Sequence, residues 1–221
     1  MPTTPLTYAR TAGALYLVTH VTSIAAVAAY GAGATALGVA LEFTLALGCL
    51  GTGILLWVLL HGAGPARAAT FATLRAVEAA VILAGTLPMV ALTLAPLSSD
   101  ATTSFTAAHT AAFLVGQGLV IGVNTIVLGS LLFTSRAVPR PLAVLGMAGG
   151  ALVLLSDLGQ LFGVVPLNGP VAAACALPIF AFEIWFAVLL LIRGLSASAV
   201  RPAPAGAATA AASDAAPSAA S

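Results

Sequence analysis

Nine polar side chains interrupt the long apolar stretches of this sequence, and they are the residues with which the chain could do chemistry. A charged group at the centre of a membrane-spanning helix costs about 2.5–3.5 kcal/mol on insertion scales, so such groups face a bundle interior or a wet cavity. Carboxylates, imidazoles and amides placed there bind an ion or small solute, relay protons, or hold helices together. The nine residues are His20, Glu42, Arg75, Glu78, His109, Gln117, Asn124, Asp157 and Glu183.

Four of these residues are expected at similar depth in the cytosolic half of a membrane-spanning bundle. Arg75 and Glu78 are three residues apart, so they share a helix face and are expected to form an ion pair. Glu183 has no ionisable neighbour in its own segment before Arg193, so it must meet a partner on another helix or stay uncharged. The expected partners are His20, Arg75 and Glu78, and a proton shared between the carboxyl groups of Glu78 and Glu183 would be a relay element.

Three further residues, Glu42, His109 and Asp157, are expected near the outer face of the membrane, away from the cytosolic half. Two interpretations stay open: these are helix-end groups that reach headgroup water, or they converge in the site of a membrane enzyme. Their spacing on three separate helices does not establish convergence, and a metal site would need all three to meet. The sequence therefore assigns no metal ligand, no catalytic residue and no cofactor.

The fourth apolar stretch carries a polar stripe. His109, Gly116, Gln117 and Asn124 fall within one broad sector at about 100° per residue. Because a lipid-facing surface would not carry such a stripe, we expect this face to point inward. Its amides then either join neighbouring helices by hydrogen bonds or line a pathway for a solute.

The composition explains why these polar residues stand out. The chain has 221 residues, of which 61% are hydrophobic and 6% are charged, whereas soluble domains carry about 25% charged residues. This excludes an ordinary soluble enzyme, a nucleic-acid binder and a disordered chain, and leaves a protein that crosses a membrane several times. The sequence has no lysine, which excludes a retinal Schiff base and a phosphate-binding P-loop. Neither the H-E-x-x-H nor the G-x-S-x-G motif occurs.

Six stretches are long and apolar enough to span a bilayer, which takes about 20 residues. The third and fourth are long enough to tilt or to project beyond the lipid. The first could instead be a cleaved signal peptide, although it is long for one. In the fifth, the spacing of Gly146 and Gly150 predicts close helix packing. The expected spans are 11–30, 40–60, 72–97, 107–133, 142–164 and 171–193.

The arginines predict the orientation. In a model with six spans, every arginine falls on one side of the membrane: before the first span, in or beside the second and fourth connections, and after the sixth. The positive-inside rule then places both termini in the cytoplasm. Residues 1–195 form the expected transmembrane domain. Residues 196–221, rich in Ala, Ser and Pro, are expected to be a disordered cytosolic tail, and residues 198–221 are expected to be dispensable for stability.

A series of short motifs runs in order through the apolar part of the chain. They are Arg10-Thr-Ala-Gly-Ala-Leu-Tyr16-Leu, Glu42, Leu74-Arg-Ala-Val-Glu78-Ala, His109, Leu128-Gly-Ser-Leu-Leu-Phe-Thr-Ser-Arg136, and Pro139-Arg140 with Leu145-Gly146. Over residues 10–195 this order resembles a bacterial integral-membrane family, domain of unknown function 4386. The resemblance implies a multi-span protein of a bacterial cell (inner) membrane, and it implies no reaction, substrate or catalytic residue.

The sequence thus predicts an all-α, polytopic membrane protein, a bundle of six transmembrane helices. Its expected partners are the lipid bilayer and a small solute or proton; no nucleic acid is expected, and no oligomeric state is predicted. Three functions remain open: passage or binding of an ion or small solute in the polar interior, a non-catalytic structural or partner-binding module, or a membrane enzyme. A continuous polar cavity along the fourth span would favour the first, and closed, mutually bonded pairs the second. An open pocket shared by Glu42, His109 and Asp157 would favour the third.

Overall fold

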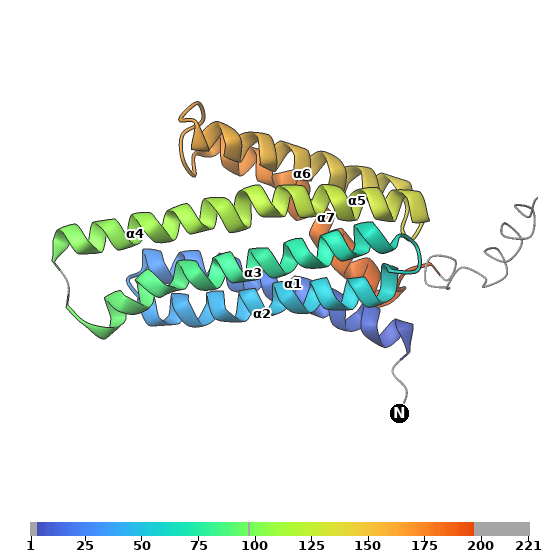
Figure 1. Cartoon of the computed structure of the whole chain (residues 1–221), viewed down its shortest axis with the longest axis horizontal. Coiled ribbons are helices and arrows are strands. Elements are labelled where there is room, and N and C mark those ends of the chain that lie inside the picture. Colours follow the sequence, from blue (N-terminus) through green and yellow to red (C-terminus); the bar gives the residue numbers. More distant parts are fainter. Residues whose placement is uncertain (1–3, 97, 197–221) are drawn as a thin grey trace, which may run out of the picture.

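The computed structural model describes residues 4–96 and 98–196, and every regular element within them is helical (Figure 1). The last residues of the expected tail, 197–221, lie outside the described residues. We call each of the six long helical units a rod. The fourth rod has 37 residues and is composed of α4, the π-helix η1 and α5. The elements are α1 (Pro5–Gly31), α2 (Thr35–Leu60), α3 (Pro65–Leu94), α4 (Ser99–Leu114), η1 (Val115–Val120), α5 (Ile121–Ser135), α6 (Arg140–Leu161) and α7 (Pro170–Ile192).

The helices begin where local capping chemistry allows, which is earlier than hydropathy indicates. α1 and α4 start at Pro5 and Ser99 rather than at the expected 11 and 107. The Thr4 and Ser98 side chains accept hydrogen bonds from the backbone N–H groups of Thr7 and Ala101, which satisfies donors of the first turn. Proline also stands in the first turn of α1, α3, α6 and α7, where its missing N–H does no harm.

The rods form a closed ring in which each packs against its neighbours in sequence. α1, α2 and α3 are consecutive antiparallel neighbours, the rod of α4, η1 and α5 lies between α3 and α6, and α7 returns to α1. The hairpin of α3 and α4 extends past the α1–α2 and α6–α7 connections (Figure 1). This is the projection expected from segments longer than the roughly 30 Å of hydrocarbon.

Glycines set the spacing of the last three rods. A Cβ on Gly150 would lie 2.7 Å from the backbone oxygen of Gly122 in α5, whereas a Cβ on Gly146 would meet the ring of Phe182 in α7 at 2.7 Å. The two glycines of the expected motif therefore face two different helices, and α6 is held closely on both sides. This tight contact is the close packing that the spacing predicted.

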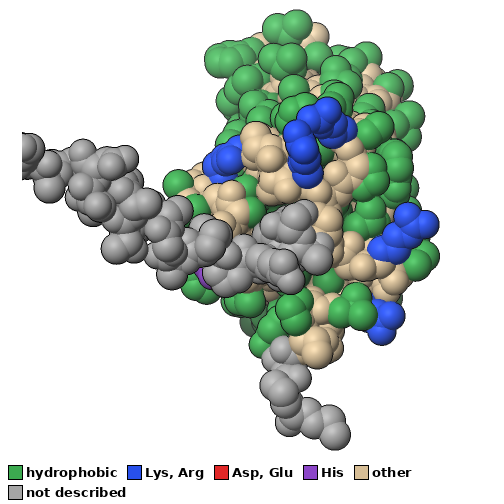
Figure 2. All heavy atoms as spheres, turned by 90° about the vertical axis from the view of Figure 1, so that its right-hand side faces the viewer, with side chains coloured by type: hydrophobic (Ala, Val, Ile, Leu, Met, Phe, Trp, Pro, Cys, Tyr) green, Lys and Arg blue, Asp and Glu red, His purple; other side chains and the backbone are tan. Residues whose placement is uncertain are grey.

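A large apolar core fills one end of the ring. Its aromatic centre joins Tyr16, Phe182 and Phe186: the Tyr16 and Phe186 rings meet edge to face at 5.6 Å between centroids, and Phe182 stacks on Phe186 at the same separation. Leucines of α2, α5, α6 and α7 complete the cluster. We call this half of the bundle the arginine end, because arginine side chains gather on its surface (Figure 2).

Both described chain ends also lie at the arginine end. The Arg10 Nε donates to the backbone oxygen of Leu191 at 3.2 Å, so the start of α1 touches the end of α7. The Ser196 N–H donates to the Ala137 carbonyl at 3.1 Å, which ties the end of the described chain to the connection between α5 and α6. Six rods and two ends on one side agree with the six-span topology.

Six helices are long and apolar enough to cross a membrane, and large apolar side chains such as Val21, Leu155 and Ile192 are about two-thirds exposed on their outer faces. Exposed apolar surface on every rod is the pattern of a bundle solvated by lipid. The protein is a multi-pass integral membrane protein with an all-α fold.

Candidate functional site

The half of the bundle away from the arginine end contains a cavity of about 370 Å³. Residues of all the helices, α1 to α7 and η1, line it, so it lies inside the ring of helices. It reaches from Arg75 and Glu78 up to Gln160 and to Asn168, an exposed residue of the α6–α7 connection. Six of the nine polar residues expected from the sequence line it: His20, Arg75, Glu78, Gln117, Asp157 and Glu183.

A closed hydrogen-bond network forms the floor of the cavity. Arg75 Nη1 donates to both Glu78 oxygens at 3.2 and 2.9 Å, and its Nε and Nη2 donate to Thr52 Oγ1 at 3.2 and 3.0 Å. Asn124 Nδ2 donates to Glu78 Oε2 at 2.7 Å, and the Tyr16 ring lies 5.2 Å below the guanidinium carbon. The expected Arg75–Glu78 pair is confirmed, and its charges are neutralised within the network.

The second buried pair joins α1 and α7. Glu183 Oε2 lies 3.3 Å from His20 Nε2, which confirms that Glu183 contacts one of its expected partners. His20 Nδ1 lies 2.8 Å from the backbone oxygen of Tyr16. Because a carbonyl only accepts, Nδ1 carries a hydrogen. An attractive contact between Nε2 and the carboxyl group then needs one further proton, on either Nε2 or Oε2, so the pair as a whole is uncharged.

A π-helical turn shapes the wall opposite this pair. η1 places Gln117 so that its Oε1 accepts a hydrogen bond from Ser23 Oγ of α1 at 2.9 Å. π-Helical turns carry an extra residue and are frequent at functional sites. The stripe prediction correctly turned Gln117 and Asn124 inward, but a constant 100° per residue gives no sign of this turn.

Asp157 lies higher in the cavity, on α6. Its carboxylate accepts a hydrogen bond from the Gln160 amide, and Gln160 Oε1 accepts one from the backbone N–H of Asn168 at 2.7 Å. A Cβ on Gly118 of η1 would lie 2.6 Å from Asp157 Oδ2, so the carboxylate occupies its present position because residue 118 has no side chain. No cationic side chain is paired with Asp157 among the described residues.

Ser156 precedes Asp157, and sequence reasoning did not single it out as a site residue. Its hydroxyl is buried in the cavity lining and has no hydrogen-bond partner within residues 4–96 and 98–196. Serine in a membrane helix ordinarily bonds to a carbonyl of the preceding turn, as Ser130 does with Val127. The aspartate beside it was the available signal, but a lone Ser-Asp pair is common in any chain.

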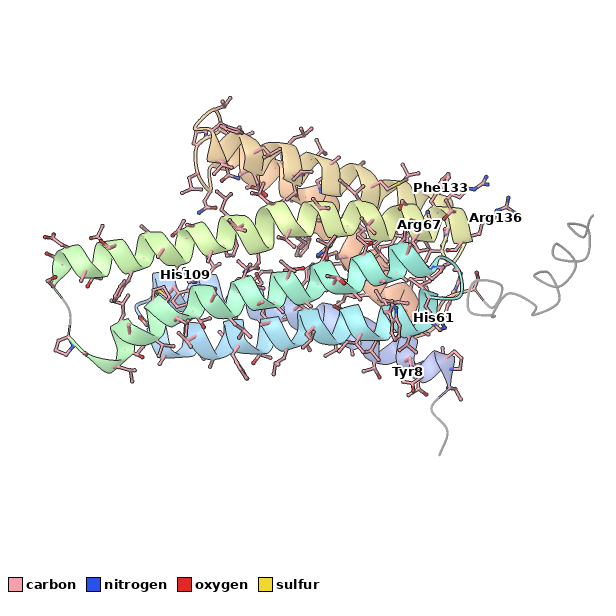
Figure 3. All side chains as sticks on the ribbon, viewed as in Figure 1. Tyr8, His61, Arg67, His109, Phe133 and Arg136 are labelled. Atoms are coloured by element: carbon pink, nitrogen blue, oxygen red, sulfur yellow. The ribbon has the colours of Figure 1, made fainter. Side chains whose placement is uncertain are left out.

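Glu42 and His109 meet in a separate cluster outside the cavity. His109 Nε2 lies 2.9 and 3.0 Å from the two Glu42 oxygens, and Tyr30 Oη donates to Glu42 Oε2 at 2.7 Å. Figure 3 shows His109 at the opposite end of the bundle from Arg67 and Arg136. The sequence placed Glu42 and His109 in one layer but did not single out Tyr30.

The proposed convergence of Glu42, His109 and Asp157 is not formed. Asp157 lines the cavity, whereas neither Glu42 nor His109 does. α2 packs against α1 and α3, while α6 packs against α5, η1 and α7, so the ring keeps the two carboxylates on different sides. Within residues 4–96 and 98–196, no group of three His, Cys, Asp or Glu side chains is placed to hold a metal ion. The geometry on which the enzyme hypothesis depended is absent from the described chain.

Comparison with curated proteins and comparison with solved structures each found no match. A family model does match, over residues 11–194, which is nearly the whole bundle from the first turns of α1 to the end of α7. The chain therefore belongs to the family described as Domain of unknown function (DUF4386).

Proposed function

We propose that this protein binds a small polar solute in the cavity between α1, α3, η1, α6 and α7. The observation that supports this proposal is a cavity of about 370 Å³ inside the bundle, in which charged and hydrogen-bonding side chains lie among a mainly apolar lining. Ligand pockets range from about 300 to 1,000 Å³. Burying polar groups without partners is costly, so the spare hydrogen-bonding capacity of Ser156 and Asp157 favours an occupant with a polar group.

Access is proposed from the side opposite the arginine end. The cavity reaches exposed Asn168 at the α6–α7 connection, and below Arg75 the apolar core of Tyr16, Phe182 and Phe186 closes the bundle. The described residues do not form the continuous polar path along the fourth span that would favour passage, and passage across the membrane would need a rearrangement of this core. With the positive-inside rule, the cavity opens away from the cytoplasm and both termini are cytoplasmic.

The alternative of a purely structural module is favoured by one part of the interior only. The network of Arg75, Glu78, Thr52 and Asn124 is closed and internally bonded, as that hypothesis requires. The hydrogen-bonding capacity of the Ser156 hydroxyl and of the Asp157 carboxylate above it is not used up in this way. The two roles thus divide by depth: structure at the floor and solute binding above it.

The experiment is a thermal-shift screen of the protein in lipid nanodiscs against amines, carboxylates, amino acids and sugars. Ser23→Phe places a ring in the cavity, whereas Val21→Phe, two residues away, adds the same ring to a position that is 67% exposed. A bound solute raises Tm in the wild type and in Val21→Phe but not in Ser23→Phe. The proposal fails if no class shifts the wild type, or if Ser23→Phe responds like the wild type.

A further inference from the structure

The charges around the cavity do not cancel, and the imbalance lies at one residue. Arg75 and Glu78 form one neutral pair, and His20 and Glu183 with their shared proton form another. Asp157 remains, and among the described residues its carboxylate is bonded only to the neutral Gln160 amide. A carboxyl group that is 8% exposed in a membrane bundle either takes up a proton or is neutralised by a cation.

No described lining residue is free to supply that cation. Arg75 uses all three guanidinium nitrogens on Glu78 and Thr52. For the same reason the cavity has no free positive group with which to bind an anionic solute. A cationic ligand, in contrast, would neutralise Asp157.

The orphaned Ser156 hydroxyl supplies an independent sign of a ligand. It is 7% exposed, lines the cavity and has no hydrogen-bond partner in the described part of the chain, although a serine in a helix can bond to its own backbone. Ser156 and Asp157 both line the cavity from α6, so the cavity offers a second acceptor oxygen to an N–H donor group that the carboxylate holds. A group with several N–H donors uses both oxygens.

The rest of the lining distinguishes an organic cation from a metal ion. Ca²⁺ takes six to eight oxygen ligands and Mg²⁺ six, and the described residues form no cluster of three ionisable ligands. Instead, the aromatic rings of Phe113 and Phe180 and the aliphatic side chain of Ile24 lie in the same cavity. Aromatic faces attract organic cations and pack their hydrocarbon parts.

We propose that the ligand of this cavity is a small organic cation, a protonated primary amine, whose ammonium group is held by the Asp157 carboxylate and the Ser156 hydroxyl. Its hydrocarbon part lies against the apolar and aromatic lining, and Gly118 provides the space in which the carboxylate sits. This assignment rests on the proposed solute-binding function and names the chemical class of the solute.

The test measures binding of three probes of one size to the protein in nanodiscs by calorimetry: cyclohexylamine, cyclohexanol and cyclohexanecarboxylate. The amine is expected to bind at least tenfold more tightly than the other two. Asp157→Asn is expected to weaken amine binding about 10- to 100-fold, as expected for a hydrogen bond to a charged group. Asp100→Asn removes an exposed carboxylate from the first turn of α4 and controls for net charge.

Ser156→Ala keeps the test decisive if Asp157→Asn does not fold. It is expected to weaken amine binding several-fold, while Ser130→Ala, whose hydroxyl bonds only to its own helix, leaves binding unchanged. Equal or tighter binding of the alcohol or the carboxylate overturns the amine assignment but leaves solute binding intact. So does an amine affinity that Asp157→Asn and Ser156→Ala do not change. If no probe binds and the broader solute screen is also negative, both proposals fail.

Discussion

The two halves of the bundle are built from the same six rods but differ in what the rods enclose. At the arginine end, Phe182, Phe186 and Leu132 are almost completely buried in an apolar cluster. In the other half the rods enclose polar side chains and a cavity, and α4 contributes no buried residue at all. The comparison indicates that packing at the arginine end holds the bundle together, and that the other half is thereby free to keep an open polar interior.

The boundary between the halves lies at the Arg75 network. Below it Tyr16 packs on Phe186, and above it the Ser23–Gln117 hydrogen bond spans the cavity wall. Functional regions are commonly taken from the less densely packed part of a fold. The following predictions test this division, from the largest expected effect to the smallest.

Topology gives an all-or-none result. The experiment uses a protein whose two native cysteines are replaced by alanine. In it, Ala66→Cys marks the start of α3 and Ser99→Cys marks the start of α4, at the two opposite ends of the bundle. We expect a membrane-impermeant maleimide to label Ser99→Cys only from outside the cell and Ala66→Cys only after permeabilisation, because arginine-rich connections stay in the cytoplasm. Labelling of Ser99→Cys only after permeabilisation would contradict both the orientation and the proposed access to the cavity.

Phe186→Ala and Phe180→Ala compare the halves with one kind of substitution. Phe186 is fully buried at the arginine end, whereas Phe180 is 44% exposed and lines the cavity. Removing a buried phenylalanine side chain costs about 3–5 kcal/mol. We expect Phe186→Ala to lower the free energy of unfolding, measured by steric trapping in bicelles, by that amount and Phe180→Ala by less than half of it. Equal losses in the free energy of unfolding would show that the two halves contribute equally to stability.

Glu78→Gln tests the boundary. The Glu78 carboxylate accepts hydrogen bonds from Arg75 and Asn124, and an amide would present N–H groups to these donors. Arg75, which is 2% exposed, would also lose its counter-charge. We expect a loss of about 3 kcal/mol in the free energy of unfolding, the lower part of the range for breaking a buried pair.

The double variant Arg75→Met with Glu78→Met serves as the control for this prediction. Replacing both members of a buried ion pair by apolar residues is often neutral or stabilising. We expect it to restore most of the lost stability, since the floor would again contain no unpaired charge. If the double variant is less stable than Glu78→Gln, the network does more than neutralise its own charges.

The sequence predicted what depends on composition and on spacing within one helix. One-sided arginines and apolar length gave the six-rod topology, and the three-residue spacing gave the Arg75–Glu78 pair. For contacts between rods, the sequence predicted only a set of candidate partners, as for Glu183, of whose three candidates His20 is the one in contact. The separation of Asp157 from Glu42 follows from the order of helices around the ring, and the cavity depends on Gly118 and a π-helical turn. Neither property leaves a periodic signal in the chain.

The smallest expected effect is that of Glu183→Gln, and it follows from which atoms of the His20–Glu183 pair carry protons. In the wild type, His20 Nδ1 bonds to the Tyr16 carbonyl, so contact between Nε2 and the Glu183 carboxyl group requires an added proton. A glutamine amide donates to a bare Nε2 without that proton. We therefore expect Glu183→Gln to fold with a free energy of unfolding within about 1 kcal/mol of the wild type, the net value of one hydrogen bond.

The proton itself provides the decisive measurement, by ¹⁵N NMR of protein labelled at histidine. In Glu183→Gln, His20 is expected to be the neutral tautomer with hydrogen on Nδ1. In the wild type the signal shows either an imidazolium or this same tautomer beside a protonated Glu183, which the infrared band of a carboxylic acid distinguishes. Glu42→Gln, which changes a carboxylate paired with His109 outside the cavity, should leave the His20 signal unchanged. A His20 ring without hydrogen on Nδ1 in Glu183→Gln would refute the shared proton, and with it the neutral pair that leaves Asp157 as the unbalanced charge of the cavity.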